Sequence, residues 1–343
     1  MAKKKILFIC GSLNQTTIMH QISQNFSDDY DCWFTPYYAD DFVKLYAKLR
    51  LIDYTIVGNG NFRKQTLAYF DKHNLQVDNR GEKYNDDYQL VFTCSDLIVP
   101  KNIRNKKILL VQEGMTDPET FPYYLVKYLH LPRWSASTST TGMSNLYTYF
   151  CIASEGYREL FIRKGADPSK LIITGIPNFD NVHQYLENDF PHKNYLLVAT
   201  SDMRETLKYE NRKKFIKRAV QIADGKQIIF KLHPNENVKR ATKEINKYAP
   251  GALIFTNGNT NHMIANCDAL LTRYSSVVLV ATVLGKKVYS DLSEEELKKL
   301  APIQNGGTSA ERIARLGKTL IEEPAKNEKE IHDEFELKQA LSH

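Results

Sequence analysis

Three short polar motifs stand directly after apolar segments that predict buried strands. A carboxylate in such a place can accept a proton from a substrate. An imidazole and a pair of hydroxyl groups can donate hydrogen bonds to a phosphate. These residue types favour a site that combines proton transfer with phosphate binding, and a glycine beside the carboxylate would let a ligand approach the backbone. The motifs are Gln112-Glu113-Gly114, His233-Pro234 and Ser275-Ser276.

The His-Pro motif lies in the segment KQIIFKLHPNENV, residues 226–238. Its short apolar run is rich in β-branched and aromatic residues, which predicts a buried strand. The strand ends at His233 because Pro234 lacks an N–H group and restricts the residue before it. Open α/β sheets bind ligands outside the carboxyl ends of their strands, so His233 is a candidate ligand contact. A turn without a ligand is the alternative.

Three polar residues, Tyr274, Ser275 and Ser276, lie between a predicted strand and the predicted helix VVLVATVLG. The N–H groups at the start of a helix and the positive end of its dipole favour a phosphate. The serine hydroxyls add two donors to such a site. The alternative is ordinary helix capping by serine.

Two more turns follow predicted strands. Thr200, Ser201 and Arg204 follow the segment YLLVAT, and the guanidinium of Arg204 would clamp a phosphate. A surface loop is the alternative for this turn. Gly11 and Ser12 follow the first apolar segment, where the backbone must bend sharply into a helix. Both turns are candidate substrate contacts.

Strands that alternate with helices in both halves of the chain would bring these turns together. Such alternation predicts parallel pairing and the α/β fold class, with two doubly wound sheets that face each other across a cleft. The expected division is a first domain at 1–177, a linker at 178–193, a second domain at 194–308 and a helical tail at 309–343. Within it we expect strands at 31–38, 54–59, 89–100 and 106–114, an irregular loop at 115–145, a helix at 155–164 and a helix N-cap at Ser309.

The composition is that of an ordinary globular protein, with 42% hydrophobic and 25% charged residues among 343. The five cysteines include no C-x-x-C pair, which argues against a disulfide framework or a zinc ribbon. A net charge of +6 suits phosphorylated ligands but is too small for a nucleic-acid surface. No apolar run has the length of a membrane span and the start lacks a signal-peptide pattern, so we expect a cytoplasmic protein.

Several well-known motifs are missing from the sequence. It contains no G-x-x-x-x-G-K-[ST], no G-x-G-x-x-G and no G-x-S-x-G. Their absence argues against a P-loop nucleotidase, a classical dinucleotide-binding protein and an α/β-hydrolase with a nucleophile elbow. Asp29-Tyr30-Asp31 is an Asp-x-Asp in a polar turn far from the other motifs, and we interpret it as solvated. We expect no metal site.

Three segments together resemble the GT-B glycosyltransferases and their relatives, the UDP-N-acetylglucosamine 2-epimerases. They are 151–182, 228–235 and 267–288. The order Glu-Gly, T-G-x-P-x-x-D, His-Pro and Ser-Ser carries the resemblance better than any single piece. It implies a GT-B fold of two Rossmann-like domains, with the acceptor on the N-terminal side and the nucleotide sugar on the C-terminal domain.

The chain departs from the epimerases at two motifs. They carry Ser-Gly-Gly followed by paired glutamates where this chain has Ser275-Ser276-Val277, and a Gly-Asp-Thr that CSDLIVPKN does not supply. The motifs look more like bacterial transferases that use CMP-activated sialic acid or Kdo, although Gln112 stands where those enzymes have an acidic residue. CDP-glycerol transferases of wall teichoic acid synthesis also carry the His-Pro motif, so a donor other than a CMP-linked sugar is an open alternative.

The resemblance implies an inverting, metal-independent glycosyltransferase without a cofactor. In that family Glu113 would be the general base, and His233 with the serine pair would hold the nucleotide phosphate. The acceptor would be a glycan or glycolipid of capsule or lipopolysaccharide biosynthesis, with possible peripheral contact with the inner membrane. The aromatic segment 121–141 would border the acceptor or touch the membrane through Phe121, Tyr123, Tyr124 and Trp134. The alternative is an isomerase of the 2-epimerase type.

Overall fold

The computed structural model describes residues 3–53, 55–205, 209–323 and 330–335. Its contacts divide the chain into two compact units, one made of Met1–Asp180 with Pro302–His343 and the other of Asn181–Ala301. The division therefore falls at Asp180 and Ala301, compared with the expected boundaries at 177, 193 and 308. No helix among the described residues is long and apolar enough to cross a bilayer.

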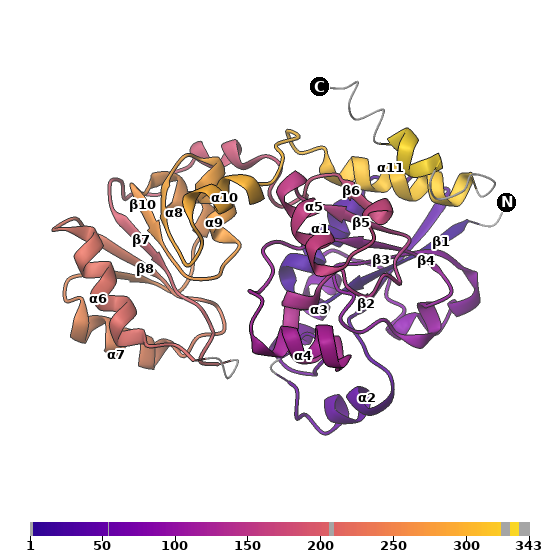
Figure 1. Cartoon of the computed structure of the whole chain (residues 1–343), viewed down its shortest axis with the longest axis horizontal. Coiled ribbons are helices and arrows are strands. Elements are labelled where there is room, and N and C mark those ends of the chain that lie inside the picture. Colours follow the sequence, from indigo (N-terminus) through magenta and orange to yellow (C-terminus); the bar gives the residue numbers. More distant parts are fainter. Residues whose placement is uncertain (1–2, 54, 206–208, 324–329, 336–343) are drawn as a thin grey trace. The chain divides into compact units, whose positions relative to one another are not determined.

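The first unit is built on a six-stranded sheet in the order β2-β1-β3-β4-β5-β6 (Figure 1). All its neighbouring strands are parallel. Both faces of a parallel sheet are covered, which is why its strands are apolar runs rather than alternating ones. Phe8, at the centre, stacks on Phe34 and Phe92 at centroid distances of 5.2 and 4.9 Å. The strands are β1 (Lys4–Cys10), β2 (Tyr30–Pro36), β3 (Tyr88–Thr93), β4 (Lys107–Val111), β5 (Tyr149–Ile152) and β6 (Leu171–Ile173).

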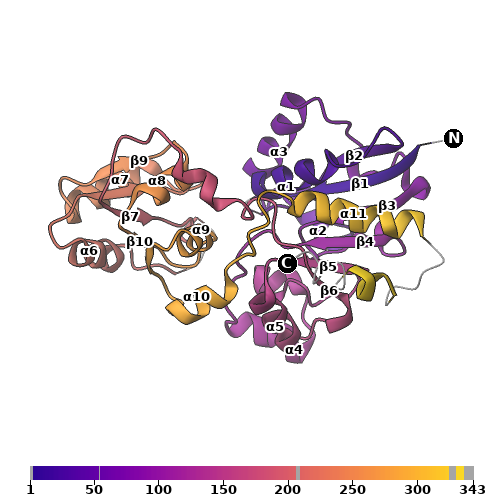
Figure 2. The same ribbon diagram turned by 90° about the horizontal axis from the view of Figure 1, so that it is seen from above.

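Helices follow most strands of the first unit. The last long helix, α11, returns to this unit and packs against α1 and β3 (Figure 2). The chain passes from β1 to β2 on one side and then to β3 on the other, so the topological switch lies between β1 and β3. The helices are α1 (Leu13–Ser23), α2 (Asp41–Lys48), α3 (Asn61–Lys72), α4 (Phe121–Leu129), α5 (Glu155–Lys164) and α11 (Ser309–Glu322).

The second unit contains a five-stranded parallel sheet in the order β11-β10-β7-β8-β9. The chain runs outward from β7 to β9 and then crosses to β10, which puts the topological switch between β7 and β10. The strands are β7 (Leu196–Ala199), β8 (Ile228–Lys231), β9 (Leu253–Phe255), β10 (Ala269–Leu271) and β11 (Lys287–Tyr289). The helices are α6 (Arg212–Ala223), α7 (Val238–Tyr248), α8 (Thr260–Asn266), α9 (Val277–Val283) and α10 (Glu294–Leu300).

The strand expected at 89–100 ends at Thr93, and the strand expected at 54–59 is wrong. Residues 55–59 form turns and bends rather than a strand, and Tyr54 lies outside the described residues. The chain folds back on itself there, so closely that a Cβ at Gly58 would lie 2.2 Å from the carbonyl oxygen of Ile52. The backbone N–H of Asn59 also donates to Asp53 Oδ1 at 3.0 Å. Such a turn leaves no extended segment for pairing.

The expected irregular loop at 115–145 contains the helix α4 and a 3-10 segment at Arg133–Thr140. One helical turn brings Tyr123 and Val126 together against Ala136 in a small buried cluster. Because Tyr123 is fully buried, the expectation that it stacks on a sugar or a membrane is wrong. The helix α5 begins and ends where it was expected, and α11 has Thr308 rather than Ser309 as its N-cap.

Candidate functional site

The carboxylate of Glu113 is held by the first turn of α1. Ser12 Oγ donates to Glu113 Oε1 at 2.6 Å, and Gln15 Nε2 donates to Oε2 at 2.5 Å. Asn14 Nδ2 donates both to Oε1 and to the carbonyl oxygen of Glu113, at 3.3 and 3.2 Å. These donors are neutral, and the start of a helix adds a favourable dipole for a negative charge. The structure therefore provides an oriented carboxylate at the carboxyl edge of the first sheet.

The side chain of Gln15, in the first turn of α1, packs directly against the backbone of Gly11. A Cβ on Gly11 would lie 2.2 Å from Gln15 Oε1, so only glycine leaves room for that amide. Ser12 caps α1 by accepting a hydrogen bond from the backbone N–H of Gln15 at 3.1 Å. The sequence singled out Gly11 and Ser12, but it missed Asn14 and Gln15. The available signal was two amide side chains in the first turn after a serine N-cap.

Gln112 and Gly114 shape the turn that carries Glu113. Gln112 is buried, and its Nε2 donates to the carbonyl oxygen of Gly114 at 2.9 Å. Its Oε1 accepts from the backbone N–H of Ala153, also at 2.9 Å. Both ends of this amide are thus bonded within the protein, and Gln112 braces the segment after β4 against the segment after β5.

Asn178 connects α1 to the segment after β6. Its Nδ2 donates to Asn14 Oδ1 at 2.6 Å and to Thr17 Oγ1 at 3.0 Å. Gln21 Nε2 in turn donates to Asn178 Oδ1 at 2.7 Å. Asn178 lies in the T-G-I-P-N stretch, and it fixes the amide of Asn14 that faces Glu113. Asn178 is not among the residues that the sequence predicts for the site.

In the second unit, the predicted polar turns gather at one edge of the sheet. The strands β10, β7 and β8 are neighbours, and all three end at this edge. Thr272 Oγ1 donates to the carbonyl oxygen of Ala199 at 2.9 Å, and the N–H of His233 donates to Thr200 Oγ1 at 3.1 Å. The segments that contain Thr200-Ser201, His233-Pro234 and Tyr274–Ser276 are therefore adjacent, at and beside the topological switch.

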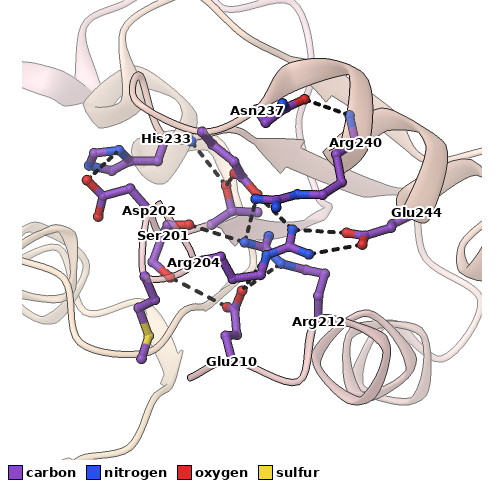
Figure 3. A network of polar contacts seen from close by, with 12 residues as sticks. Ser201, Asp202, Arg204, Glu210, Arg212, His233, Asn237, Arg240 and Glu244 are labelled. Carbon is purple, nitrogen blue, oxygen red and sulfur yellow. Dashed lines mark hydrogen bonds and ion pairs between the residues drawn. The ribbon is translucent and has the colours of Figure 1, made fainter. Parts of the chain in front are cut away.

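The imidazole of His233 has a defined orientation (Figure 3). Its Nδ1 accepts a hydrogen bond from the backbone N–H of Asn235 at 3.2 Å and lies 3.6 Å from Asp202 Oδ2. Acceptance at Nδ1 favours the tautomer with the proton on Nε2. The side chain is 37% exposed, so this Nε2–H can serve as a hydrogen-bond donor to a ligand.

Arg204 belongs to a cluster of ion pairs beside this edge (Figure 3). It forms a two-point contact with Glu244, with both N–O distances at 2.9 Å. Arg212 lies 2.7 Å from Glu236 and 2.8 Å from Glu210. Burial lowers the pKa of Arg204, but its contacts with these glutamates outweigh burial and raise it overall. The sequence-based prediction placed a phosphate on Arg204, and the structure shows its guanidinium engaged with carboxylates.

The ion-pair cluster reaches His233 through Thr200. Thr200 Oγ1 donates to Glu236 Oε2 at 2.5 Å and accepts the N–H of His233. Burial raises the pKa of Glu236, against the opposing effects of Arg212 and Thr200. The side chains of Arg212 and Glu236 are 3% and 0% exposed. This buried pair thus fixes the hydroxyl that holds the backbone of the His-Pro turn.

The serine pair stands at the start of α9. Ser276 is the N-cap, and the carbonyl oxygens of Ser275 and Ser276 accept from Val278 and Leu279 at 3.1 and 3.0 Å. Within the described part of the chain, the Ser276 hydroxyl makes no capping bond to this helix. Burial raises the pKa of the neighbouring Tyr274. Among the residues described, no group of three or more His, Cys, Asp or Glu is arranged to hold a metal ion.

Comparison with solved structures identifies the fold as GT-B-like. A UDP-GlcNAc 2-epimerase from Neisseria meningitidis, bound to UDP-GlcNAc, is 13% identical with a TM-score of 0.53, over 94% of this chain and 100% of that one. The wall teichoic acid polymerase TagF, soaked with CDPG, is 14% identical with a TM-score of 0.53, over 94% and 90%. Anabaena HepE, in complex with UDP and glucose, is 14% identical with a TM-score of 0.50, over 99% of both chains. No family model and no curated protein matches the sequence.

Proposed function

We propose that this protein is an inverting, metal-independent glycosyltransferase that uses a nucleotide sugar. The observation that carries the proposal is the carboxylate of Glu113, whose two oxygens are held at the end of β4 by three neutral donors, Ser12, Asn14 and Gln15. Such fixed geometry suits a general base, because a proton can be accepted only along a defined direction. The GT-B-like fold, shared with enzymes solved in complex with nucleotide sugars or nucleotides, supports the substrate class.

The proposed reaction is a direct displacement at the anomeric carbon. A hydroxyl oxygen of the acceptor forms the new bond to that carbon, and its proton passes to the carboxylate of Glu113. The bond between the anomeric carbon and the phosphate oxygen breaks, and its electron pair leaves with the nucleotide phosphate. Attack and departure on opposite sides invert the configuration of the sugar.

The second unit would stabilise the charge that grows on the leaving phosphate. With its proton on Nε2, His233 would donate to the phosphate at the sheet edge, and Ser275 and Ser276 at the start of α9 would add their hydroxyls at the same edge. Preorganised donors of this kind stabilise a developing oxyanion without reorganisation. Ser201 and Tyr274 would complete the nucleotide site, whereas the buried hydroxyl of Thr200 is engaged by Glu236 and the His233 backbone and acts by holding the His-Pro turn. The proposed reaction uses neither a metal nor a cofactor.

For the donor we favour a CMP-linked acidic sugar of the Kdo or sialic acid type. The motif order Glu-Gly, His-Pro and Ser-Ser supports this choice, and the acceptor would be a bacterial surface glycan or a lipid-linked precursor. TagF shares the fold and was solved with CDPG, whereas two other structures with this fold were solved with UDP-GlcNAc or UDP, so the choice of CMP depends on the motifs alone. We expect the protein to work in the cytoplasm.

Replacing Glu113 by glutamine tests the base directly. Glu113→Gln keeps the size of the side chain but cannot accept the proton, so turnover of the donor should fall by about 10²- to 10⁴-fold. Nucleotide binding should persist, because the proposed nucleotide residues lie in the second unit. Glu159→Gln, an exposed glutamate on α5, is the matched control. A Glu113→Gln variant with the wild-type rate would disprove the assigned base.

The second candidate function is a 2-epimerase-like isomerase. The likeness in fold to the Neisseria meningitidis enzyme bound to UDP-GlcNAc favours it. An isomerase needs no acceptor, so incubation with UDP-GlcNAc alone separates the two functions. An epimerised product in the NMR spectrum would show that the protein is an isomerase and contradict the transferase proposal. Unchanged UDP-GlcNAc would support the transferase over the isomerase.

A further inference from the structure

The helix α2 in the first unit turns apolar side chains toward solvent. Phe42 is 78% exposed, Leu45 50% and Leu49 58%, at positions that lie on one side of a helix. Among the described side chains of this helix, only Ala47 is buried. A helix that leaves its larger apolar residues in water has a face without a partner in the described structure.

A second exposed apolar surface is formed by α4 and the residues that follow it. Phe121 is 73% exposed and Tyr128 68%, and Tyr124 stacks on Tyr128 at a centroid distance of 6.3 Å. Leu129 at the end of α4 and Trp134 after it are exposed as well. The opposite side of α4 packs inward through Tyr123 and Val126, so the helix is apolar on two sides.

The basic residues on these two surfaces favour an anionic lipid surface over a protein partner. The stretch 42–52 contains Lys44, Lys48 and Arg50 and no acidic residue. Asp41 begins α2, and Arg50 pairs with Asp53 at 2.8 Å, so Lys44 and Lys48 are the cations this face offers. The stretch 120–154 likewise contains no Asp or Glu, and it includes Lys127 and Arg133. Exposed aromatic and leucine side chains interspersed with cations are the composition of helices that lie in the interface of a membrane with anionic lipids.

The topology places the two helices at one edge of the first sheet. The helix α2 follows the carboxyl end of β2, and α4 follows the carboxyl end of β4. These strands are parallel members of one sheet, so both helices leave it at the same edge. Figure 1 shows both along the lower margin of the first unit. Glu113 stands at this edge too, between β4 and α4.

We propose that α2 and α4 form a docking face for an anionic lipid bilayer. Phe42, Leu45, Leu49, Phe121 and Tyr128 would enter the interface, and the lysines of α2 would contact lipid phosphates. The face lies beside the edge that carries Glu113, so docking would present a lipid-linked acceptor to the base. The binding itself does not depend on the proposed reaction.

Cosedimentation of the full-length protein with lipid vesicles tests the docking face. The wild-type protein should bind vesicles of phosphatidylcholine with phosphatidylglycerol, bind phosphatidylcholine alone weakly, and dissociate as salt is added. Lys44→Gln with Lys48→Gln should weaken binding to the anionic vesicles by about 30-fold. Phe42→Ser with Leu49→Ser, and Phe121→Ser with Tyr128→Ser, should each reduce binding to both kinds of vesicle.

Tyr209→Ser is the matched control, because Tyr209 is 83% exposed but lies in the second unit. It should bind vesicles as the wild type does. Unchanged Tm values would show that the variants are folded. Absence of binding to anionic vesicles, or apolar variants that bind like the wild type, would overturn the proposal. So would a dimer in sedimentation velocity that Phe42→Ser with Leu49→Ser converts to monomer, since a second copy would then cover the face.

Discussion

The hydroxyl of Ser12 donates a 2.6 Å hydrogen bond to the carboxylate of Glu113, across 101 positions of sequence. The same hydroxyl accepts the backbone N–H of Gln15 and caps α1. One side chain thus starts the helix and orients the carboxylate at the end of β4. The position of Glu113 therefore depends on how α1 begins, and a change in its first turn should affect catalysis.

We predict that Gly11→Ala lowers the turnover rate by about tenfold, the cost of about one hydrogen bond. The new Cβ would lie 2.2 Å from Gln15 Oε1, so Gln15 must move and release Glu113 Oε2. Overpacking of this kind costs about 1–3 kcal/mol of stability. Steady-state kinetics and thermal unfolding measure the two effects.

The double variant Gly11→Ala with Gln15→Ala separates the clash from the lost hydrogen bond. Removing the amide makes room for the new methyl group, so the stability should recover relative to Gly11→Ala while the turnover rate stays low. If Gly11→Ala behaves like the wild type in both measurements, the packing at the start of α1 does not govern Glu113.

We predict that Arg212→Met destabilises the second unit by about 3–5 kcal/mol, because it removes the nearest cation from the buried carboxylates of Glu236 and Glu210 and leaves only Arg204, 3.6 and 3.7 Å away, to balance them. Arg212 and Glu236 lie 2.7 Å apart with almost no exposure. Nucleotide affinity should fall as well, since Glu236 fixes Thr200 and Thr200 holds the His233 backbone. Urea unfolding and calorimetric titration with the nucleotide measure these changes.

The exposed pair of Lys298 and Glu294 is the control for this prediction. These side chains are 69% and 80% exposed. Lys298→Met should therefore change the unfolding free energy by no more than about 0.5 kcal/mol. Equal effects of Arg212→Met and Lys298→Met would show that the buried cluster does not stabilise the unit.

Lys164 should make the stability of the first unit depend on pH. Burial lowers the pKa of Lys164 from 10.5 to about 8, an effect that Glu119 opposes and Arg163 reinforces. Between these values the unfolded chain binds more protons than the folded one, so the stability contributed by this group rises with pH. Relative to Lys164→Met, the wild type should gain about 2–3 kcal/mol from about pH 8 to about pH 10.

Urea unfolding over this range, compared between wild type and Lys164→Met, measures the effect. Lys217→Met, an exposed lysine on α6, is the control and should follow the wild type. A constant difference between wild type and Lys164→Met across the range would show that Lys164 does not titrate as its surroundings require.

The alternation of apolar strands with helices is enough to predict two doubly wound parallel sheets, and the resemblance of three segments to the GT-B glycosyltransferases implies the GT-B fold. The sequence also placed Glu113 and His233 at the ends of strands, since Gly114 and Pro234 punctuate those strands. It failed at 55–59, where an apolar stretch is turned back by backbone contacts with Ile52 and Asp53 rather than by any local signal.

Long-range hydrogen bonds were beyond prediction. The bond from Asn178 to Asn14 joins positions 164 residues apart, and no local pattern indicates it. Arg204 looked like a phosphate ligand because its carboxylate partner, Glu244, lies 40 positions away on α7. Residues whose partners lie in other elements can be assigned only once the elements are packed.

Thermal stabilisation by nucleotides tests the central claim most directly. The panel is CMP, CDP, UMP, UDP and GDP, added to wild type, His233→Ala and the exposed control His183→Ala. We predict a rise in Tm with CMP that persists in His183→Ala and is lost in His233→Ala. A rise with UDP instead would favour a UDP-sugar enzyme. No rise with any of the nucleotides would contradict a nucleotide site at His233.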